Sequence, residues 1–334
     1  MIKQLAWPSA FLVLGILLFI GLIEGIDIME LKSLPDAFFN YNKSSINHIV
    51  WIEIRLPRLL LAFATGAALG LSGYLMQVLV RNPLADPYIL GSSSGASLFA
   101  AIFFILLPPE LLSLSILIVL TFCGAFGTNL LSLFLARVKG QIIPYRMILV
   151  GIAISGMAMA LLSMLIYTSG EDSSWKSIIF WTFGSFQSAS WEKVIYITIV
   201  VSIIGVISYI LFYPIQIMEL GAENADRIGV PVNRYRILLL LLSSVLTASA
   251  VSMAGPIGFI GLIMPHLLRI VFKFQLTKYF IPWLCYVSGI FLMFCEIVSS
   301  IVFPPQGIPA GILMSIIGVP FFLFLLLKAN DKYL

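Results

Sequence analysis

Residues 54–80 read IRLPRLLLAFATGAALGLSGYLMQVLV, and beyond Arg58 this stretch contains no charged residue. An α-helix rises about 1.5 Å per residue, so about 20 residues cross a bilayer core about 30 Å thick. The stretch is therefore long enough to span a membrane. Small residues let the backbones of neighbouring membrane helices approach closely, and those in this stretch are Gly66, Ala67, Ala68, Gly70, Ser72 and Gly73.

The rest of the chain repeats this apolar character. Of its 334 residues 60% are hydrophobic and 10% are charged, and the mean hydropathy is +1.08. A soluble domain needs polar residues on every outward face, so this composition excludes one and predicts an all-α polytopic membrane protein. We expect ten spans, at 8–24, 54–80, 91–107, 112–136, 144–168, 193–213, 235–254, 257–273, 280–302 and 308–327.

The distribution of lysine and arginine predicts the orientation in a cell (inner) membrane. Cationic loops stay on the cytoplasmic side during insertion. With the N-terminus inside, ten spans place 13 of the 19 cations on the cytoplasmic side, which favours two cytoplasmic termini. The first span ends Gly21-Leu22-Ile23-Glu24 without a small-residue cleavage pattern, so we expect it to be retained. The net charge of +4 follows from these inner cations and requires no nucleic-acid partner.

Almost nothing is expected to fold outside the membrane, so residues 1–334 are interpreted as one transmembrane domain. Three longer connections stand out, at 25–53 and 169–192 outside and at 214–234 inside. Glycines recur in the later spans and favour close helix packing there too, as in the groups Gly151, Ser155, Gly156 and Gly255, Gly258, Gly261.

Two motifs for covalent chemistry are absent from the sequence, which contains no GxxxxGK[ST] phosphate loop and no HExxH. His48 and His266 lie on opposite sides of the membrane in the expected topology, so a shared metal site is not expected. We therefore predict no catalytic residue, no metal site and no cofactor bound by this chain.

Glu296 is the one carboxylate well inside an expected span. A charge in hydrocarbon is costly unless it is paired or faces water. Two interpretations stay open: Glu296 lines a pathway, or it makes a buried hydrogen bond to Ser299 or Ser300 one helical turn away.

The inner connection contains the stretch MELGAENADRIGV, which predicts a short helix between Gly221 and Gly229. A helix on the membrane surface can enter a groove on a partner protein. The charge pattern of Glu219, Glu223, Asp226 and Arg227 taken alone favours a solvated connecting helix.

Most of the chain resembles a known family through several long motifs in the same order. These are RLPRLLLAFATGAALGLSGYLMQVLVRNPLADPYILGSSSGA, WTFGSFQSASW, LGAENADRIGVPV, GPIGFIGLIMPHLLR and GIPAGILMSIIGVPFFLFLL. They resemble the FecCD-type permease subunits of bacterial ABC importers for iron-siderophores, haem and cobalamin. The resemblance implies a type II ABC importer fold in which two ten-span permeases pair, two cytoplasmic ATPases bind ATP and Mg²⁺, and a substrate-binding protein docks outside.

The resemblance also implies roles for individual residues. Arg55 and Arg58 would dock carboxylates of the binding protein, since a guanidinium binds a carboxylate through two hydrogen bonds. Many relatives carry a third arginine where this chain has Ser300, which leaves the third docking contact open. The helix at 221–230 would couple the permease to the ATPase, with the expected contacts Gly221, Glu223, Ala225, Asp226, Arg227 and Gly229.

The cytoplasmic gate is expected at two places. Asn82 and Leu84 match family residues near the gate, and Pro83 and Pro87 would end the helix there. Pro144 and Tyr145 stand where relatives have a small polar pair, which suggests a narrower or differently shaped inner constriction. The DHR motif that relatives often have near KFQLTKYF is missing, so the resemblance implies no ATPase contact through that motif.

The leading interpretation is an ATP-driven importer permease for a metal chelate, with hydrolysis on a separate subunit. A ferric siderophore, haem, cobalamin or a smaller oxyanion would suit such a scaffold. An ion-coupled secondary transporter and a polytopic membrane enzyme are the alternatives. The enzyme would need clustered His, Asp or Glu at one membrane face, which the sequence does not show.

Overall fold

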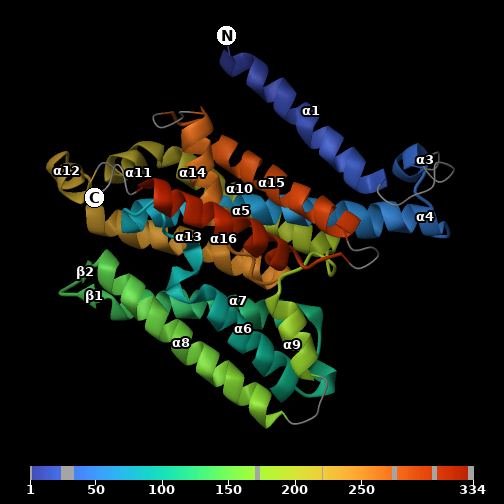
Figure 1. The fold of residues 1–334 in the computed structure, drawn as a ribbon, viewed down its shortest axis with the longest axis horizontal. Helices are drawn as coiled ribbons and strands as arrows, with labels where there is room; N and C mark the ends of the chain where they lie inside the picture. Colours follow the sequence, from blue (N-terminus) through green and yellow to red (C-terminus); the bar gives the residue numbers. More distant parts are fainter. Residues whose placement is uncertain are drawn as a thin grey trace.

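The computed structural model describes residues 2–23, 34–169, 174–219, 221–272, 277–302 and 307–329. Within these ranges the chain forms a helical bundle and one antiparallel hairpin, in which Arg137 pairs with Ile142 and Val138 with Gln141 (Figure 1). The fold class predicted from composition is confirmed.

The elements follow one another along the chain with short connections. The α-helices are α1 Ile2–Ile23, α3 Leu34–Phe39, α4 Ile46–Ile49, α5 Leu56–Val80, α6 Ser92–Ala101, α7 Leu114–Leu135, α8 Pro144–Thr168, α9 Ser174–Thr182, α10 Trp191–Ile210, α11 Phe212–Glu219, α12 Ala222–Arg227, α13 Val232–Ala254, α14 Ile260–Phe272, α15 Phe280–Val302 and α16 Ala310–Ala329. Four further segments are helical: the π-helices η1 Val50–Arg55 and η3 Ile102–Leu106, and the 3-10 helices η2 Pro87–Leu90 and η4 Pro109–Leu111. The strands are β1 Arg137–Val138 and β2 Gln141–Ile142.

Helix α5 lies at the centre of the bundle. It packs against α15, α13, α14 and α10 (Figure 1). In the continuous helix Ile46–Val80, 89% of the most apolar 18-residue stretch is buried inside the protein. In α8 the corresponding share is 17%. The quoted stretch therefore forms the core, and α8 presents most of its apolar surface outward.

Helices α6, α7, α8 and α9 form a second group beside this core (Figure 1). Helix α6 packs against both α7 and α8, and α13 joins the two groups by packing against α5 on one side and α7 on the other. The boundary between the groups therefore follows α6 and α13.

The expected close helix packing at glycine is confirmed at several positions. A methyl group at Gly66 would overlap the Ser288 carbonyl of α15, and one at Gly73 would overlap the Gly261 carbonyl of α14. Gly151 similarly admits the Ile89 carbonyl. At Gly156 and Gly258 a methyl group would meet no atom within 4 Å, so close packing does not account for those two glycines.

Six described helices are long and apolar enough to cross a membrane, namely Ile46–Val80, Leu114–Leu135, Pro144–Thr168, Trp191–Ile210, Val232–Ala254 and Phe280–Val302. The other four expected spans correspond to shorter apolar helices at Leu12–Leu22, Ser92–Leu106, Ile260–Ile270 and Ala310–Phe324. Six of the ten expected spans are thus long and apolar enough to cross a membrane. The total of ten stays a prediction.

Boundaries differ from expectation where glycine or proline interrupts a helix. The span expected from residue 257 begins at Ile260, because Gly255 has a φ of 74° and residues 255–259 run without helix. The short helix expected at 221–230 is α12, bounded by Gly221 at φ 129° and Gly229 at φ 88°. Both glycines adopt the left-handed region that side chains disfavour.

Candidate functional site

The expected site residues gather at the two ends of the bundle. At one end, here called the RLPR end, α5 begins and α15 ends. At the other, here called the α12 end, α5 ends, α8 begins and α12 projects from the bundle (Figure 1). The direction of each end relative to the membrane stays a prediction.

Arg58 and Glu296 form an ion pair at the RLPR end. The Arg58 Nε donates to the Glu296 Oε1, and the side chains are 21% and 3% exposed. The expected roles were docking for Arg58 and, for Glu296, a pathway role or a bond to Ser299 or Ser300. The contact between them was not predicted, because 238 residues separate them and no local pattern links α5 to α15.

Arg55 also makes an internal contact. Its Nη1 donates to the Leu22 carbonyl at 2.7 Å, and its guanidinium carbon lies 5.7 Å from the centre of the Trp51 ring. Leu22 lies in the last turn of α1, where unpaired helix carbonyls favour a cation. Arg55 therefore connects α1 to the start of the long central helix.

Ser300 and Ser299 lie in the last turn of α15. The Ser300 hydroxyl donates to the backbone carbonyls of Glu296 and Ile297, at 3.2 and 2.9 Å. The Ser299 hydroxyl donates to the Ile308 carbonyl, which ties the start of the following segment to α15. Ser300, where the resemblance left the third docking contact open, is thus bonded to its own helix.

Lys193 forms a buried contact at the RLPR end that was not predicted from the sequence. Lys193 is 3% exposed, and its Nζ donates to the Ser188 hydroxyl at 2.7 Å and the Met253 carbonyl at 3.2 Å. Met253 lies in the last turn of α13, where a cation is favoured by the helix carbonyls. Lys193 therefore joins α10 to the end of α13.

Asn82 and Leu84 form a turn at the α12 end. Arg81 ends α5 at a φ of 58°, and the Asn82 side-chain oxygen accepts from the Leu84 N–H at 2.9 Å. Asp86 follows and accepts from the Tyr88 N–H at 2.8 Å. Burial raises the pKa of Asp86 to about 6, while hydrogen bonds from the Tyr88 and Phe259 backbones act in the opposite direction.

Pro144 and Tyr145 open α8 at the same end of the bundle. Pro144 occupies the first helical turn, where its missing N–H leaves no bond unmade. The Tyr145 side chain is 70% exposed. Tyr145 therefore has room to move without disturbing the core.

Helix α12 projects from the bundle (Figure 1). Of its described side chains, those of Asn224, Asp226 and Arg227 are exposed. Ala225 is fully buried and anchors it, while Asp226, Arg227 and Gly229 are exposed and Ile228 is 68% exposed. Gly221 is buried beside Arg81. The Glu223 side chain lies outside the described residues, so its expected contact stays a prediction.

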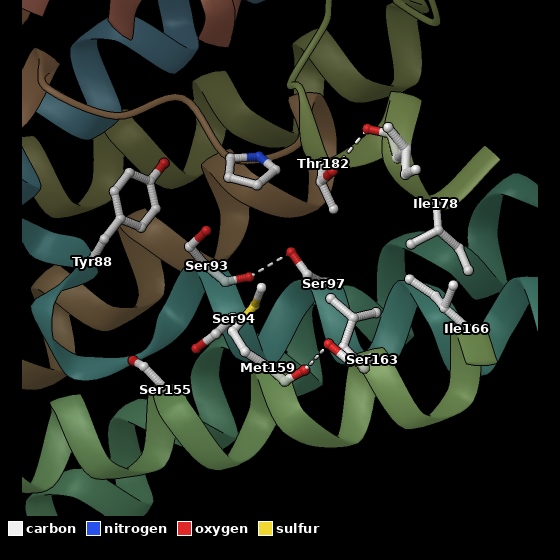
Figure 2. A pocket seen from close by; sticks show the side chains of 13 residues that line it. Tyr88, Ser93, Ser94, Ser97, Ser155, Met159, Ser163, Ile166, Ile178 and Thr182 are labelled. Atoms are coloured by element: carbon white, nitrogen blue, oxygen red, sulfur yellow. Dashed lines mark hydrogen bonds between the residues drawn. The ribbon is translucent and has the colours of Figure 1, made fainter. Parts of the chain in front are cut away.

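A cavity of about 540 Å³ lies between α6, α8 and α9 (Figure 2). Seven of its lining residues carry hydroxyl groups and none is charged. The hydroxyl-bearing residues are Tyr88, Ser93, Ser94, Ser97, Ser155, Ser163 and Thr182. Sequence analysis missed this site, because each serine alone is an ordinary helix residue and only the meeting of three helices brings them together.

The described residues contain no group of three His, Cys, Asp or Glu side chains close enough to hold a metal ion. His48 is buried, with its Nδ1 accepting from the Asn42 N–H at 3.1 Å and its Nε2 lying 3.8 Å from Asp36. Both ring nitrogens of His48 thus lie near groups of the preceding residues, Asp36 and Asn42.

Comparison with known proteins agrees with this arrangement. The model of the FecCD transport family matches residues 12–328. The hemin transport system permease HmuU of Yersinia pestis is 33% identical, covering 96% of this chain and 97% of its own. The vitamin B12 import system permease BtuC of Vibrio vulnificus is also 33% identical, covering 87% of this chain and 86% of its own.

A solved inward-facing structure assigned to the metal-chelate type of ABC transporter has the same fold. Its TM-score is 0.81 at 29% identity, and the match covers 96% of this chain and 97% of that one. The relatives are transport subunits, and the helices described above suit a multi-pass membrane protein. By the family match over nearly its full length, the chain belongs to the FecCD transport family as a membrane permease.

Proposed function

We propose that this chain is one of two identical membrane subunits of an importer that moves a metal chelate, such as a ferric siderophore, haem or cobalamin. A separate pair of cytoplasmic ATPases would bind ATP and Mg²⁺, and a substrate-binding protein would deliver the cargo outside. Both termini would then be cytoplasmic. The chain itself would perform no covalent chemistry.

The hydroxyl-lined cavity is the observation that supports this function most directly. In a mostly apolar bundle, polar groups gathered around an open space provide contacts for a polar cargo. The space is about 540 Å³ and its lining is neutral. A neutral lining suits a conduit, because a strongly charged one would retain its cargo.

Three of the seven hydroxyls each donate to a carbonyl of their own helix. Ser97 donates to the Ser93 carbonyl and Ser163 to the Met159 carbonyl, each at 2.9 Å, and Thr182 donates to the Ile179 carbonyl at 2.7 Å (Figure 2). Because each proton is used within the helix, the oxygen lone pairs are the groups left for a ligand. The cavity would thus make weak contacts with donor groups of the cargo.

The remaining surfaces fit the expected partners. The exposed and projecting α12 suits insertion into a groove on the ATPase. Helix α8 exposes large apolar residues beside the cavity, among them Ile152, Met157 and Met164, and this face suits contact with a second copy. Arg55 and Arg58 are the proposed contacts for binding-protein carboxylates, although both also have internal partners.

The test is co-purification of the tagged chain with the ATPase and binding protein encoded beside it, followed by ATPase activity in nanodiscs. A stable complex whose activity rises with the binding protein loaded with one of several ferric chelates, haem or cobalamin would support the function and narrow the cargo. A chain that recruits no ATPase but accumulates cargo along an ion gradient would instead support a secondary transporter. Cargo recovered chemically altered would support a membrane enzyme.

A further inference from the structure

Arg269 lies at the meeting point of three helices near the α12 end. Its Nη2 donates to the Gln77 Oε1 of α5 at 3.0 Å and lies 3.6 Å from the Glu219 Oε1 of α11. Its guanidinium carbon is 5.7 Å from the centre of the Tyr74 ring. The side chain is 17% exposed. One cation on α14 is thus bound to both α5 and α11.

Gln77 continues the chain of contacts toward the start of α14. Its Nε2 donates to the Gly261 carbonyl at 3.1 Å and to the Leu262 carbonyl at 3.4 Å. In a regular helix the Gly261 carbonyl would accept from residue 265, but residue 265 is proline and has no N–H. The Gln77 amide replaces that missing donor, and Gln77 is 3% exposed.

The segment just before the first turn of α14 borders the cavity. Residues 255–259 run without helix between α13 and α14, and Pro256 lines the cavity. Tyr88, which also lines it, bonds to both the Ile257 carbonyl at 3.1 Å and the Ile257 N–H at 3.2 Å. Phe259 has a φ of 68°, a strained value for a residue with a side chain, so the segment has a defined and unusual conformation.

At its other end the chain of contacts reaches α12. Glu219 is the last residue of α11, and the Gly221 N–H two positions later bonds to the Met218 carbonyl at 3.2 Å. Helix α11 packs against both α12 and α5. A displacement of α12 would therefore act on Glu219, because the Gly221–Met218 hydrogen bond joins the start of α12 to the end of α11.

We propose that Arg269 is a positioning residue that couples α12 to the segment 255–259 at the cavity, through Glu219 on one side and Gln77 on the other. This inference rests on the proposed function, because it assumes that α12 receives the motion of an ATPase. The Arg269 guanidinium holds α14 against α11 and α5 at once, so a shift of α11 transmits to the first turn of α14. The cargo cavity thereby senses the state of the partner.

A purely structural role for Arg269 predicts lower stability without loss of coupling. The readout that separates the two roles is cargo transported per ATP hydrolysed by the complex assembled in proteoliposomes. Glu219→Gln keeps the shape of a side chain that is 37% exposed, so this variant is expected to fold and assemble. Arg269→Gln and the double variant complete a cycle, in which members of one relay give non-additive effects.

We expect Glu219→Gln and Arg269→Gln each to lower transport per ATP by about two- to thirtyfold. The double variant should lose no more than Arg269→Gln alone. Lys278→Gln is the matched control, because Lys278 lies 5.7 Å from the Tyr209 ring as Arg269 does from Tyr74 but belongs to no such chain of contacts among the described residues. Its transport per ATP should equal that of the unmodified complex.

Unchanged transport per ATP in both single variants would overturn the relay, as would additive losses in the double variant. If Arg269→Gln fails to assemble, Glu219→Gln alone decides the question. The unmodified complex tests the proposed function separately: if it recruits no ATPase or moves no cargo, the importer itself is refuted and the relay falls with it.

Discussion

Arg58 and Glu296 are paired where α5 begins and α15 ends, so a cation proposed for docking already has a carboxylate partner inside its own chain. Removing one member of a fully buried pair typically costs about 3–5 kcal/mol, because the other charge stays buried without compensation. Arg58 is 21% exposed, which reduces that penalty. The pair is thus both a structural contact and a competitor for any docking partner.

Glu296→Gln is expected to lower the free energy of unfolding by about 1–3 kcal/mol. Thermal unfolding of the purified chain in detergent measures the change. Glu110→Gln is the control, because Glu110 lies exposed in η4. The double variant Arg58→Gln and Glu296→Gln should recover part of the loss, since two amides can pair without buried charge. Equal stability of Glu296→Gln and the unmodified chain would contradict the role of the pair.

Docking of the binding protein should weaken by about two- to tenfold in Arg55→Gln or Arg58→Gln, the size of effect expected from a partly exposed charge pair. The loss should shrink at high salt, because salt screens exposed charges. Binding measured on permease in nanodiscs tests this. Lys176→Gln is the control, since Lys176 is exposed on α9 and lies 5.7 Å from Trp175, as Arg55 lies from Trp51. Unaltered affinity in both arginine variants would assign them to structure alone.

Reversing the charge of α12 should impair ATPase binding. Arg227 is exposed, so Arg227→Glu should leave the fold intact while reducing the ATPase retained on the tagged permease by about tenfold or more, because like charges across an interface are costly. Arg137→Glu on β1 changes an equally exposed cation at the same end and should retain the partner. Equal losses in the two variants would indicate general charge attraction instead of a specific contact.

Narrowing the cavity should slow transport without affecting assembly. Ser155→Ala removes one hydroxyl and should change the transport rate by about two- to tenfold, the effect of one hydrogen bond. Ser155→Leu also fills space and should reduce transport further. Ser202→Leu is the control, because Ser202 lines a separate apolar groove between α5, α10 and α15. If Ser155→Leu transports at the normal rate, the cavity is not on the cargo path.

Close packing at Gly73 should make its replacement destabilising. A methyl group there would overlap the Gly261 carbonyl, so Gly73→Ala must separate α5 from α14 and should cost about 1–3 kcal/mol. Gly127→Ala on α7 meets no atom within 4 Å and should stabilise the helix by up to about 1 kcal/mol. Thermal unfolding compares the two. A stability of Gly73→Ala matching that of Gly127→Ala would show that the helices adjust without cost.

Local sequence was sufficient to predict the apolar helices, the bounds of α12 and the end of α5. Gly221 and Gly229 marked the bounds of α12, and Pro83 and Pro87 marked the end of α5, because backbone preferences act over a few residues. The start of α14 was misplaced by three residues, since the helix at 257–259 was lost to contacts with Tyr88 and Asp86 that are far away in the sequence.

Apolar length alone established that the chain is a helical membrane protein, because a bilayer demands long helices whose backbone bonds are satisfied within each segment. Which polar side chains meet was decided only by the packing of those helices. Arg58 pairs with Glu296, which is 238 residues away in the sequence, and Arg269 donates to Gln77, which is 192 residues away. A helix specifies which residues share its own face but carries no local signal for the face that a distant helix will present, so these contacts exist only in the folded bundle.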